Sequence, residues 1–280
     1  MILIKKPETL RTFLQSCSNL SAPVGFVPTM GALHEGHAKL IRLSKGNSAL
    51  TVVSIFVNPT QFNDPSDFNK YPSSIEEDIL LLANCGTDIL FLPSVSEIYS
   101  GGTNSLEKYP LGYLETILEG KYRPGHFQGV CQVMHRLLQI VDPHKLFMGQ
   151  KDYQQCLVIA KLIELMKIKS ELIVVPTLRE ADGLALSSRN RRLNKDERNR
   201  AATISAALYH IAAGYKKSVV QVKHEAINML EEKKFRVDYV EVADAATLEI
   251  QQEKTNRPQV ALIAAFLGEV RLIDNLLLPG

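Results

Sequence analysis

Two histidines three residues apart stand in a glycine-containing segment, residues 28–37, directly after a short apolar run. The segment reads PTMGALHEGH, and its two glycines allow the backbone to approach a ligand closely. A helix is expected to follow, and a helix N-terminus directs N–H groups and a positive dipole at an anion. The imidazoles of His34 and His37 can donate hydrogen bonds to phosphate oxygens on which charge develops during a displacement. The segment therefore predicts phosphate chemistry.

Two other interpretations of this histidine pair are a zinc site and a helix cap without further function. A zinc site is not favoured, because His-Glu-Gly-His is one residue shorter than the metalloprotease helix signature and contains a glycine. Neither GxGxxG nor the Gly-Lys-Ser/Thr phosphate loop occurs in the chain. The remaining alternative is that His34 and His37 only cap a helix. Their place after a strand and beside two glycines favours phosphate binding over capping alone.

Three further polar clusters follow apolar runs or a predicted domain link. Gln61 ends a short segment after the second run and offers both a donor and an acceptor to a carboxylate or hydroxyl group. Lys151, after the fourth run, can neutralise phosphate as a point charge. Residues 186–191 combine two serines with Arg189 and can close over a triphosphate. Each cluster alone is more typical of a turn or a solvated loop, but together they indicate a site.

The elements that must position these clusters alternate along the first two thirds of the chain. Short apolar runs occur at residues 24–27, 51–57, 88–92, 145–147 and 172–175. The clearest helical face between them recurs at three- and four-residue spacings from Val130 to Val141, and Asp142-Pro143 ends it. Continuously apolar strands between amphipathic helices predict an α/β fold, a Rossmann-like parallel sheet with helices on both faces. Ligands of such sheets bind beyond the carboxyl ends of the strands.

A change of pattern near residue 177 predicts a second domain. One charged helix is expected to about residue 213, another from 219 to 233, and a strand at 237–242. Residues 260–266 and 270–273 form a predicted hairpin joined through Gly268-Glu269. The expected division is thus a Rossmann-like domain at 1–176 and a smaller C-terminal α+β lid domain at 177–280.

Composition and charge narrow the class of protein. The 32 basic and 30 acidic residues nearly cancel, which argues against nucleic acid as a partner and favours small molecules. The longest apolar run is too short to span a membrane and the start turns polar too early for a signal peptide, so a cytoplasmic protein is expected. The four cysteines are scattered without metal-ligand spacing and are expected to be buried thiols.

The ordered set of motifs resembles a known family. Residues 28–37 are similar to the His-x-Gly-His element of class I aminoacyl-tRNA synthetases and small-molecule nucleotidyltransferases. Combined with residues 58–62, 71–72, 123–127, 149–155 and 180–190, they resemble the pantothenate synthetase (pantoate–β-alanine ligase) family. The resemblance covers about residues 24–193, and the tail, with Asp238-Tyr239 and residues 271–275, is similar but less specific.

The resemblance implies a two-step ligation. The carboxylate of (R)-pantoate attacks the α-phosphate of ATP, with Mg²⁺ screening the phosphates, and gives pantoyl adenylate and pyrophosphate. The amine of β-alanine then displaces AMP and yields pantothenate, a coenzyme A precursor. Members of this family are typically homodimers.

The resemblance also assigns roles to individual residues. ATP would be bound by Met30, Gly31, Ala32, Leu33, His34, Glu35, Gly36, His37, Gly149, Gln150, Lys151, Asp152, Leu178, Leu186, Ser187, Ser188 and Arg189. Of these, His37, His34, Lys151 and Arg189 would be catalytic. Gln61 and Gln155 would bind pantoate, Gln61 also β-alanine, and Glu76, Glu77 or Asp78 would supply a carboxylate for Mg²⁺. Two departures are that Gln150 stands where many members carry Glu, and Met148 where an aromatic residue is frequent.

Two rival functions fit part of the pattern. A nucleotidyltransferase with the same histidine element would leave AMP or CMP on its product and would consume no amine. A nucleotide-binding regulator would show no turnover, but pure binding does not need the three separate charge-stabilising residues His37, Lys151 and Arg189.

Overall fold

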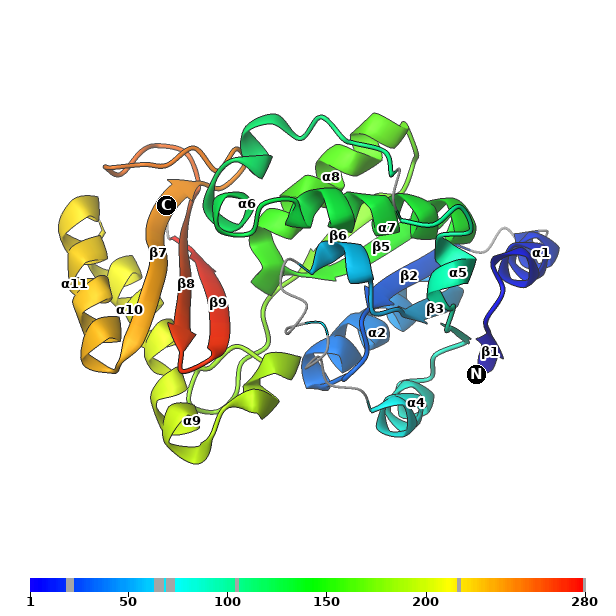
Figure 1. The fold of residues 1–280 in the computed structure, drawn as a ribbon, viewed down its shortest axis with the longest axis horizontal. Helices are drawn as coiled ribbons and strands as arrows, with labels where there is room; N and C mark the ends of the chain where they lie inside the picture. Colours follow the sequence, from blue (N-terminus) through cyan, green and yellow to red (C-terminus); the bar gives the residue numbers. More distant parts are fainter. Residues whose placement is uncertain (19–22, 63–67, 69–73, 104–105, 216–217, 279–280) are drawn as a thin grey trace. The chain divides into compact units, whose positions relative to one another are not determined.

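The computed structural model describes residues 1–18, 23–62, 68, 74–103, 106–215 and 218–278. Tyr71 and Pro72, which contribute to the family resemblance, lie outside these ranges. The chain folds as two compact units (Figure 1). Unit 1 comprises Met1–Gly149 and Gln155–Val175, and unit 2 comprises Gln150–Gln154 and Pro176–Gly280. Within the described ranges, no helix has the length and apolar character needed to cross a membrane.

The strands of unit 1 form one sheet in the order β1-β4-β3-β2-β5-β6, and the described pairings are all parallel. Their bounds are β1 (Ile2–Ile4), β2 (Val24–Thr29), β3 (Leu50–Ile55), β4 (Ile89–Phe91), β5 (Lys145–Gly149) and β6 (Glu171–Val175). Five of these strands and the Rossmann-like class are confirmed. The edge strand β1 was not predicted, because its three residues are too few to show a pattern.

Helices cover both faces of this sheet. Their bounds are α1 (Pro7–Ser18), α2 (Glu35–Asn47), α4 (Ile75–Asn84), α5 (Val95–Ile98), α6 (Leu118–Tyr122), α7 (His126–Val141) and α8 (Tyr153–Met166), with short 3-10 turns η1 (Pro59–Gln61), η2 (Gly112–Glu115) and η3 (Gln150–Asp152). The predicted helical face near residue 130 is α7, and it ends at Asp142, whose φ of 43° lies in the left-handed region just before Pro143. Helix α8 begins in unit 2 and continues in unit 1.

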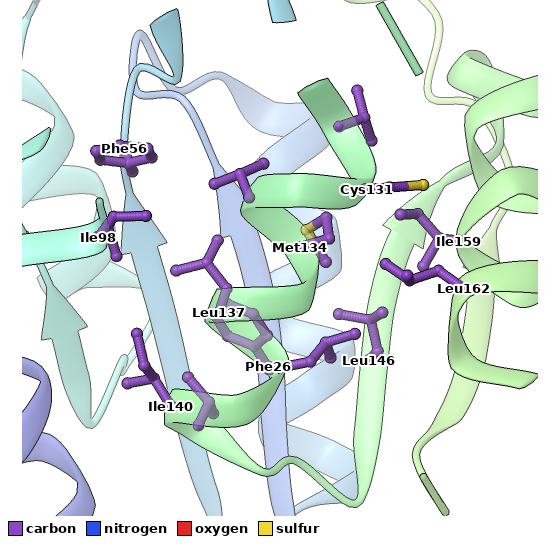
Figure 2. Packing of buried hydrophobic residues seen from close by; sticks show 14 of the residues in the cluster. Phe26, Phe56, Ile98, Cys131, Met134, Leu137, Ile140, Leu146, Ile159 and Leu162 are labelled. Atoms are coloured by element: carbon purple, nitrogen blue, oxygen red, sulfur yellow. The ribbon is translucent and has the colours of Figure 1, made fainter. Parts of the chain in front are cut away.

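Adjacent residues of one strand pack on opposite faces of the sheet. Phe26 of β2 belongs to a core shared with α1, α7 and α8, whereas Val27, the next residue, belongs to a core shared with α2 and α4. Figure 2 shows Met134 and Leu137 of α7 over Phe26 on the first face. Burial on both faces explains why these strands are apolar without alternation.

The strand order sets where a ligand can bind. Strand β2 lies between β3 and β5, and the chain runs outward through β3 and β4 before it returns to form β5 on the other side of β2. Such a reversal is a topological switch point, where the loops after neighbouring strands diverge and leave a crevice. The loops after β2, β3 and β5 are those that carry the predicted residues His37, Gln61 and Lys151.

Unit 2 has a three-stranded antiparallel sheet in the order β7-β8-β9. Its elements are η4 (Ser188–Arg192), α9 (Lys195–Ala201), α10 (Thr203–Gly214), α11 (Val219–Glu232), β7 (Phe235–Asp244), β8 (Gln259–Leu267) and β9 (Val270–Leu277). The predicted hairpin is β8–β9, and its turn contains Gly268 at a φ of 57°. The single helix expected to residue 213 is wrong, because it is two helices divided at Ala202. Neither glycine nor proline marks this division in the sequence.

Candidate active site

The loop between β2 and α2 has a strained backbone. Gly31 and Ala32 both have positive φ, 81° and 49°. Glycine adopts this conformation readily, whereas for Ala32 it is unfavourable and needs support from the surrounding structure. The support comes from Asp78 on the first turn of α4. Its two carboxylate oxygens accept hydrogen bonds from the backbone N–H groups of Ala32, at 2.9 Å, and Leu33, at 2.7 Å.

Asp78 stabilises the backbone of the loop between β2 and α2. Its side chain is buried with 2% exposure, and the Oδ1 atom that accepts from Leu33 also accepts from the Ser74 hydroxyl group at 3.2 Å. Three hydrogen bonds thus give Asp78 a structural role in the loop, and its role as a metal ligand, like that of the exposed Glu77 on the same turn, stays a prediction. Among the described residues, no group of three or more His, Cys, Asp and Glu side chains could hold a metal ion. Mg²⁺ held chiefly by nucleotide phosphates needs only one or two carboxylates.

Removing the charge of Asp78 is expected to destabilise the loop. In Asp78→Asn, the amide group would place a donor against one of the two N–H groups and leave it buried without an acceptor, at a cost of roughly 1–3 kcal/mol. Thermal unfolding followed by circular dichroism measures this loss. Glu76→Gln, a change on the same helix turn at a side chain that is not buried, is the control. Equal unfolding temperatures for Asp78→Asn and the wild type would contradict this role of Asp78.

The histidine pair caps α2 through its Nδ1 atoms. His34 is the N-cap residue, and its Nδ1 accepts a hydrogen bond from the N–H of Gly36 at 3.1 Å. The Nδ1 of His37 accepts from the N–H of His34 at 3.3 Å, and the two ring centroids are 4.1 Å apart. Because both Nδ1 atoms are acceptors, the proton of each neutral ring sits on Nε2. Capping therefore supports phosphate binding: it fixes the tautomer in which each Nε2 can donate to an anion.

Gln61 is held at both ends of its side chain and at its backbone. Its Oε1 accepts from the amide of Asn58 at 3.1 Å, and its Nε2 contacts the sulfur of Met30 at 2.9 Å. Its carbonyl oxygen is 2.8 Å from Nδ1 of His126. The contact with Met30 brings the predicted pantoate residue against the predicted ATP loop. Because a thioether is a weak acceptor, Nε2 can exchange this contact for a substrate oxygen.

Helix α7 packs closely against the turn that carries Gln61. The buried Asn58, 1% exposed, also donates to the carbonyl oxygen of Gly129 at 3.1 Å. A Cβ atom at Gly129 would lie 2.2 Å from the carbonyl oxygen of Thr60, so this position requires glycine. In the segment between α6 and α7, the guanidinium group of Arg123 is 3.0 Å from Nε2 of His126, the first residue of α7. His126 thus links α7 to the backbone of Gln61.

The predicted residues that follow β5 fall in two units. Gly149 ends the strand in unit 1, whereas Gln150, Lys151 and Asp152 form η3 in unit 2. The Lys151 side chain is 15% exposed, and its ammonium group is 3.5 Å from the carboxylate of Asp152. Gln155, the second predicted pantoate residue, is half-buried in α8 and belongs to unit 1.

The other predicted nucleotide-binding segment of unit 2, residues 178–189, is a loop whose two ends are joined by a backbone hydrogen bond. The N–H of Leu186 donates to the carbonyl oxygen of Leu178 at 3.0 Å, which brings Leu178 beside residues 186–189. The Ser187 hydroxyl group caps η4 by accepting from the N–H of Arg189 at 3.3 Å. Ser188 is buried. These contacts give the loop a defined backbone on which Arg189 is placed.

Three residues that had no predicted role form hydrogen bonds to predicted site residues. Asn58 and His126 position Gln61, and Asn275 of β9 binds the Gln150–Asp152 turn. All three lie in motifs that carry the family resemblance, which was the only available signal. No periodicity could have paired Asn275 with Lys151, 124 positions earlier.

The sheet and its loops define the class of this protein: a Rossmann-like α/β protein with a loop that contains glycines and histidines at the switch point of the sheet. The family model described as pantoate-β-alanine ligase matches residues 2–277. The chain therefore belongs to the pantoate-β-alanine ligase family, and its activity is the ligation that produces pantothenate.

Individual relatives agree with this assignment over nearly the whole chain. The pantothenate synthetase of Cytophaga hutchinsonii is 44% identical over 283 residues, which cover 99% of both chains. The crystal structure of pantothenate synthetase from Thermus thermophilus is 38% identical, with a TM-score of 0.92 and 99% coverage of both chains. The pantoate-β-alanine ligase from Francisella tularensis, crystallised in complex with β-γ ATP and β-alanine, is 37% identical with a TM-score of 0.84, covering 99% of this chain and 97% of that one.

Proposed function

We propose that this chain makes pantothenate in two chemical steps, with ATP as the activating substrate. In the first step the pantoate carboxylate attacks the α-phosphorus of ATP, and the bond to the β,γ-pyrophosphate breaks. In the second step the amine of β-alanine attacks the acyl carbon of the adenylate and AMP departs. The observation that carries this proposal is the loop at residues 30–37. Asp78 anchors its backbone, the Nδ1 atoms of both histidines accept backbone hydrogen bonds, and Gln61 contacts Met30.

Charge is the main obstacle in the first step, because a carboxylate must attack a polyanion. Preorganised donors that face developing charge lower such a barrier. In this proposal His34 and His37 donate to the phosphates from the start of α2, where the helix dipole also favours an anion. Lys151 and Arg189 supply two full positive charges from unit 2. Mg²⁺, when bound, would screen the phosphates, with Glu77 or Asp78 as the carboxylate proposed to hold it.

Substrate orientation is proposed for the two glutamines. Because the Oε1 of Gln61 is bound to Asn58, its Nε2 is the atom proposed to donate to a pantoate oxygen. The same side chain is proposed to contact β-alanine in the second step, after the adenylate has formed. Gln155, on α8, would hold pantoate from a second element of unit 1. The homodimer and the cytoplasmic location expected above stay predictions.

The order of the steps can be tested by isotope exchange. Labelled pyrophosphate should enter ATP in the presence of pantoate and Mg²⁺ without β-alanine, because adenylate formation is reversible and needs no amine. A reaction without pantoate is the control. Protein that makes pantothenate but shows no exchange would contradict the adenylate order. Mass spectrometry of the complete reaction separates the rival functions, since a nucleotidyltransferase would leave AMP or CMP on its product and a regulator would form no product.

A further inference from the structure

The amide of Asn275 joins the last strand of unit 2 to the turn that carries Lys151. Asn275 is 2% exposed, and its Nδ2 donates to the carbonyl oxygens of Gln150, at 3.0 Å, and Lys151, at 2.9 Å. Its Oδ1 accepts from the Nε2 of Gln150 at 3.1 Å. The side chain therefore uses both amide donors and its acceptor on two consecutive residues of η3.

The orientation of this amide follows from its partners. Two backbone carbonyl oxygens can only accept, so the nitrogen of Asn275 must face them and its oxygen must face Gln150. Residue 150 must then present a donor. Glutamine does so, whereas an ionised glutamate would place an acceptor against an acceptor. This requirement explains why glutamine at position 150 suits this chain, although many members of the family carry Glu there.

A buried ion pair extends the same contact to the second nucleotide segment. Arg179 donates to the carboxylate of Asp274 at 2.5 and 3.0 Å, and the Asp274 side chain is fully buried. The same guanidinium group donates to the carbonyl oxygen of Asn275 at 3.2 Å and to that of Gly183 at 3.1 Å. Gly183 lies in the turn that leads into residues 186–189, and Arg179 pairs with Ala185 across that turn.

We propose that Asp274 and Asn275, with Arg179, form a clamp that sets the distance between the Lys151 turn and the Leu186–Arg189 loop. The inference rests on the proposed phosphate roles of Lys151 and Arg189 and goes beyond them, because it names the residues that place these two charges for one triphosphate. Asn275 is a positioning residue and touches no substrate in this proposal. Rigid placement matters because a charge displaced by about 1 Å can cost a large part of its catalytic effect.

The test replaces the donors of Asn275 while keeping its shape. Asn275→Asp retains the size of the side chain but presents oxygens to two carbonyl oxygens. In pyrophosphate exchange, we expect kcat/KM for ATP to fall about tenfold to a hundredfold, the range for losing two buried hydrogen bonds. KM for ATP should rise and kcat should fall per folded molecule, while KM for pantoate stays unchanged. Leu277→Ala, an exposed change on the same strand, is the matched control and should leave all three constants unchanged.

A simple loss of stability gives a different result. It lowers the apparent kcat in proportion to the folded fraction and leaves KM for ATP unchanged, and that outcome would overturn the proposal. If Asn275→Asp does not fold, Asn275→Ala removes the same donors without adding a charge and is judged by the same constants.

A double-mutant cycle tests the clamp separately from the proposed phosphate-binding role of Lys151. If Asn275 acts by placing Lys151, Asn275→Asp should have a much smaller effect in the Lys151→Ala background than in the wild type. Full additivity would overturn the clamp and leave the role of Lys151 intact. Normal exchange in Lys151→Ala alone would overturn both, because there would then be no phosphate contact for Asn275 to position.

Discussion

Lys151→Ala is expected to lose pyrophosphate exchange by about 10²–10³ in rate, by analogy with the removal of one donor from an oxyanion hole. The same variant should convert supplied pantoyl adenylate and β-alanine at a nearly normal rate. Negative charge near this ammonium group is greatest while pyrophosphate leaves, whereas the second step expels AMP, which carries less charge. Lys151→Ala should therefore slow the first half-reaction severely and the second hardly at all.

The structure explains why no neighbour can easily replace Lys151. Its backbone is fixed by Asn275, its side chain is mostly buried, and its ammonium group is a long 3.5 Å from the carboxylate of Asp152. A long contact of this kind leaves the charge able to move to a phosphate oxygen when the nucleotide binds. Lysine acts here as a compact point charge on a flexible stem.

The measurement needs a folded Lys151→Ala variant and a control substitution at a lysine outside the proposed site. Lys161→Ala on α8 removes an equal charge that is paired with the exposed Glu164, and both half-reactions should stay normal. Circular dichroism establishes that each variant is folded. An equal loss in both half-reactions of folded Lys151→Ala would mean that this residue positions the pantoyl group throughout, and the phosphate-specific role would be wrong.

Gln61→Ala and Gln155→Ala are expected to weaken pantoate use by about tenfold to 150-fold each, because a hydrogen bond to a charged group is worth roughly 1.5–3 kcal/mol. The affinity for ATP in calorimetry should change far less. For Gln61 the structure sharpens this expectation, because the hydrogen bond from Asn58 to Oε1 fixes the orientation of the amide whose Nε2 is proposed to donate to the substrate. Truncation to alanine removes that donor and also leaves the buried amide of Asn58 with one acceptor fewer.

A surface glutamine provides the comparison. Gln221→Ala on α11 removes a side chain that bonds only locally to Glu225, and it should leave the constants for pantoate and ATP unchanged. KM for pantoate from steady-state rates and pantoate affinity from calorimetry give two independent readings. Normal pantoate behaviour together with poor ATP binding in either variant would reverse the assignment of that glutamine.

Residue type and spacing predicted phosphate chemistry and five strands of unit 1, whereas the ligation was predicted from the family resemblance. Strands buried on both faces are largely apolar, and an amphipathic helix must repeat every three to four residues, so β2 to β5 and α7 could be predicted from local sequence. The edge strand β6 is partly exposed and was predictable from its β-branched residues. The loop at residues 28–37 carries its own signal, because glycines and paired histidines after a strand are informative within ten residues. The hairpin β8–β9 was predictable for the same reason, since its turn residues lie between its strands.

Only the tertiary structure decided which residues hold the site in place. Asp78 reaches the backbone of Ala32 and Leu33 across more than forty positions, and Asn275 reaches Lys151 across 124. Such partners have no fixed spacing, because their meeting depends on strand order and helix packing and not on a local period. For the same reason the sequence could indicate Asp78 only as an acidic residue, whereas the fold shows that two backbone N–H groups donate to its carboxylate.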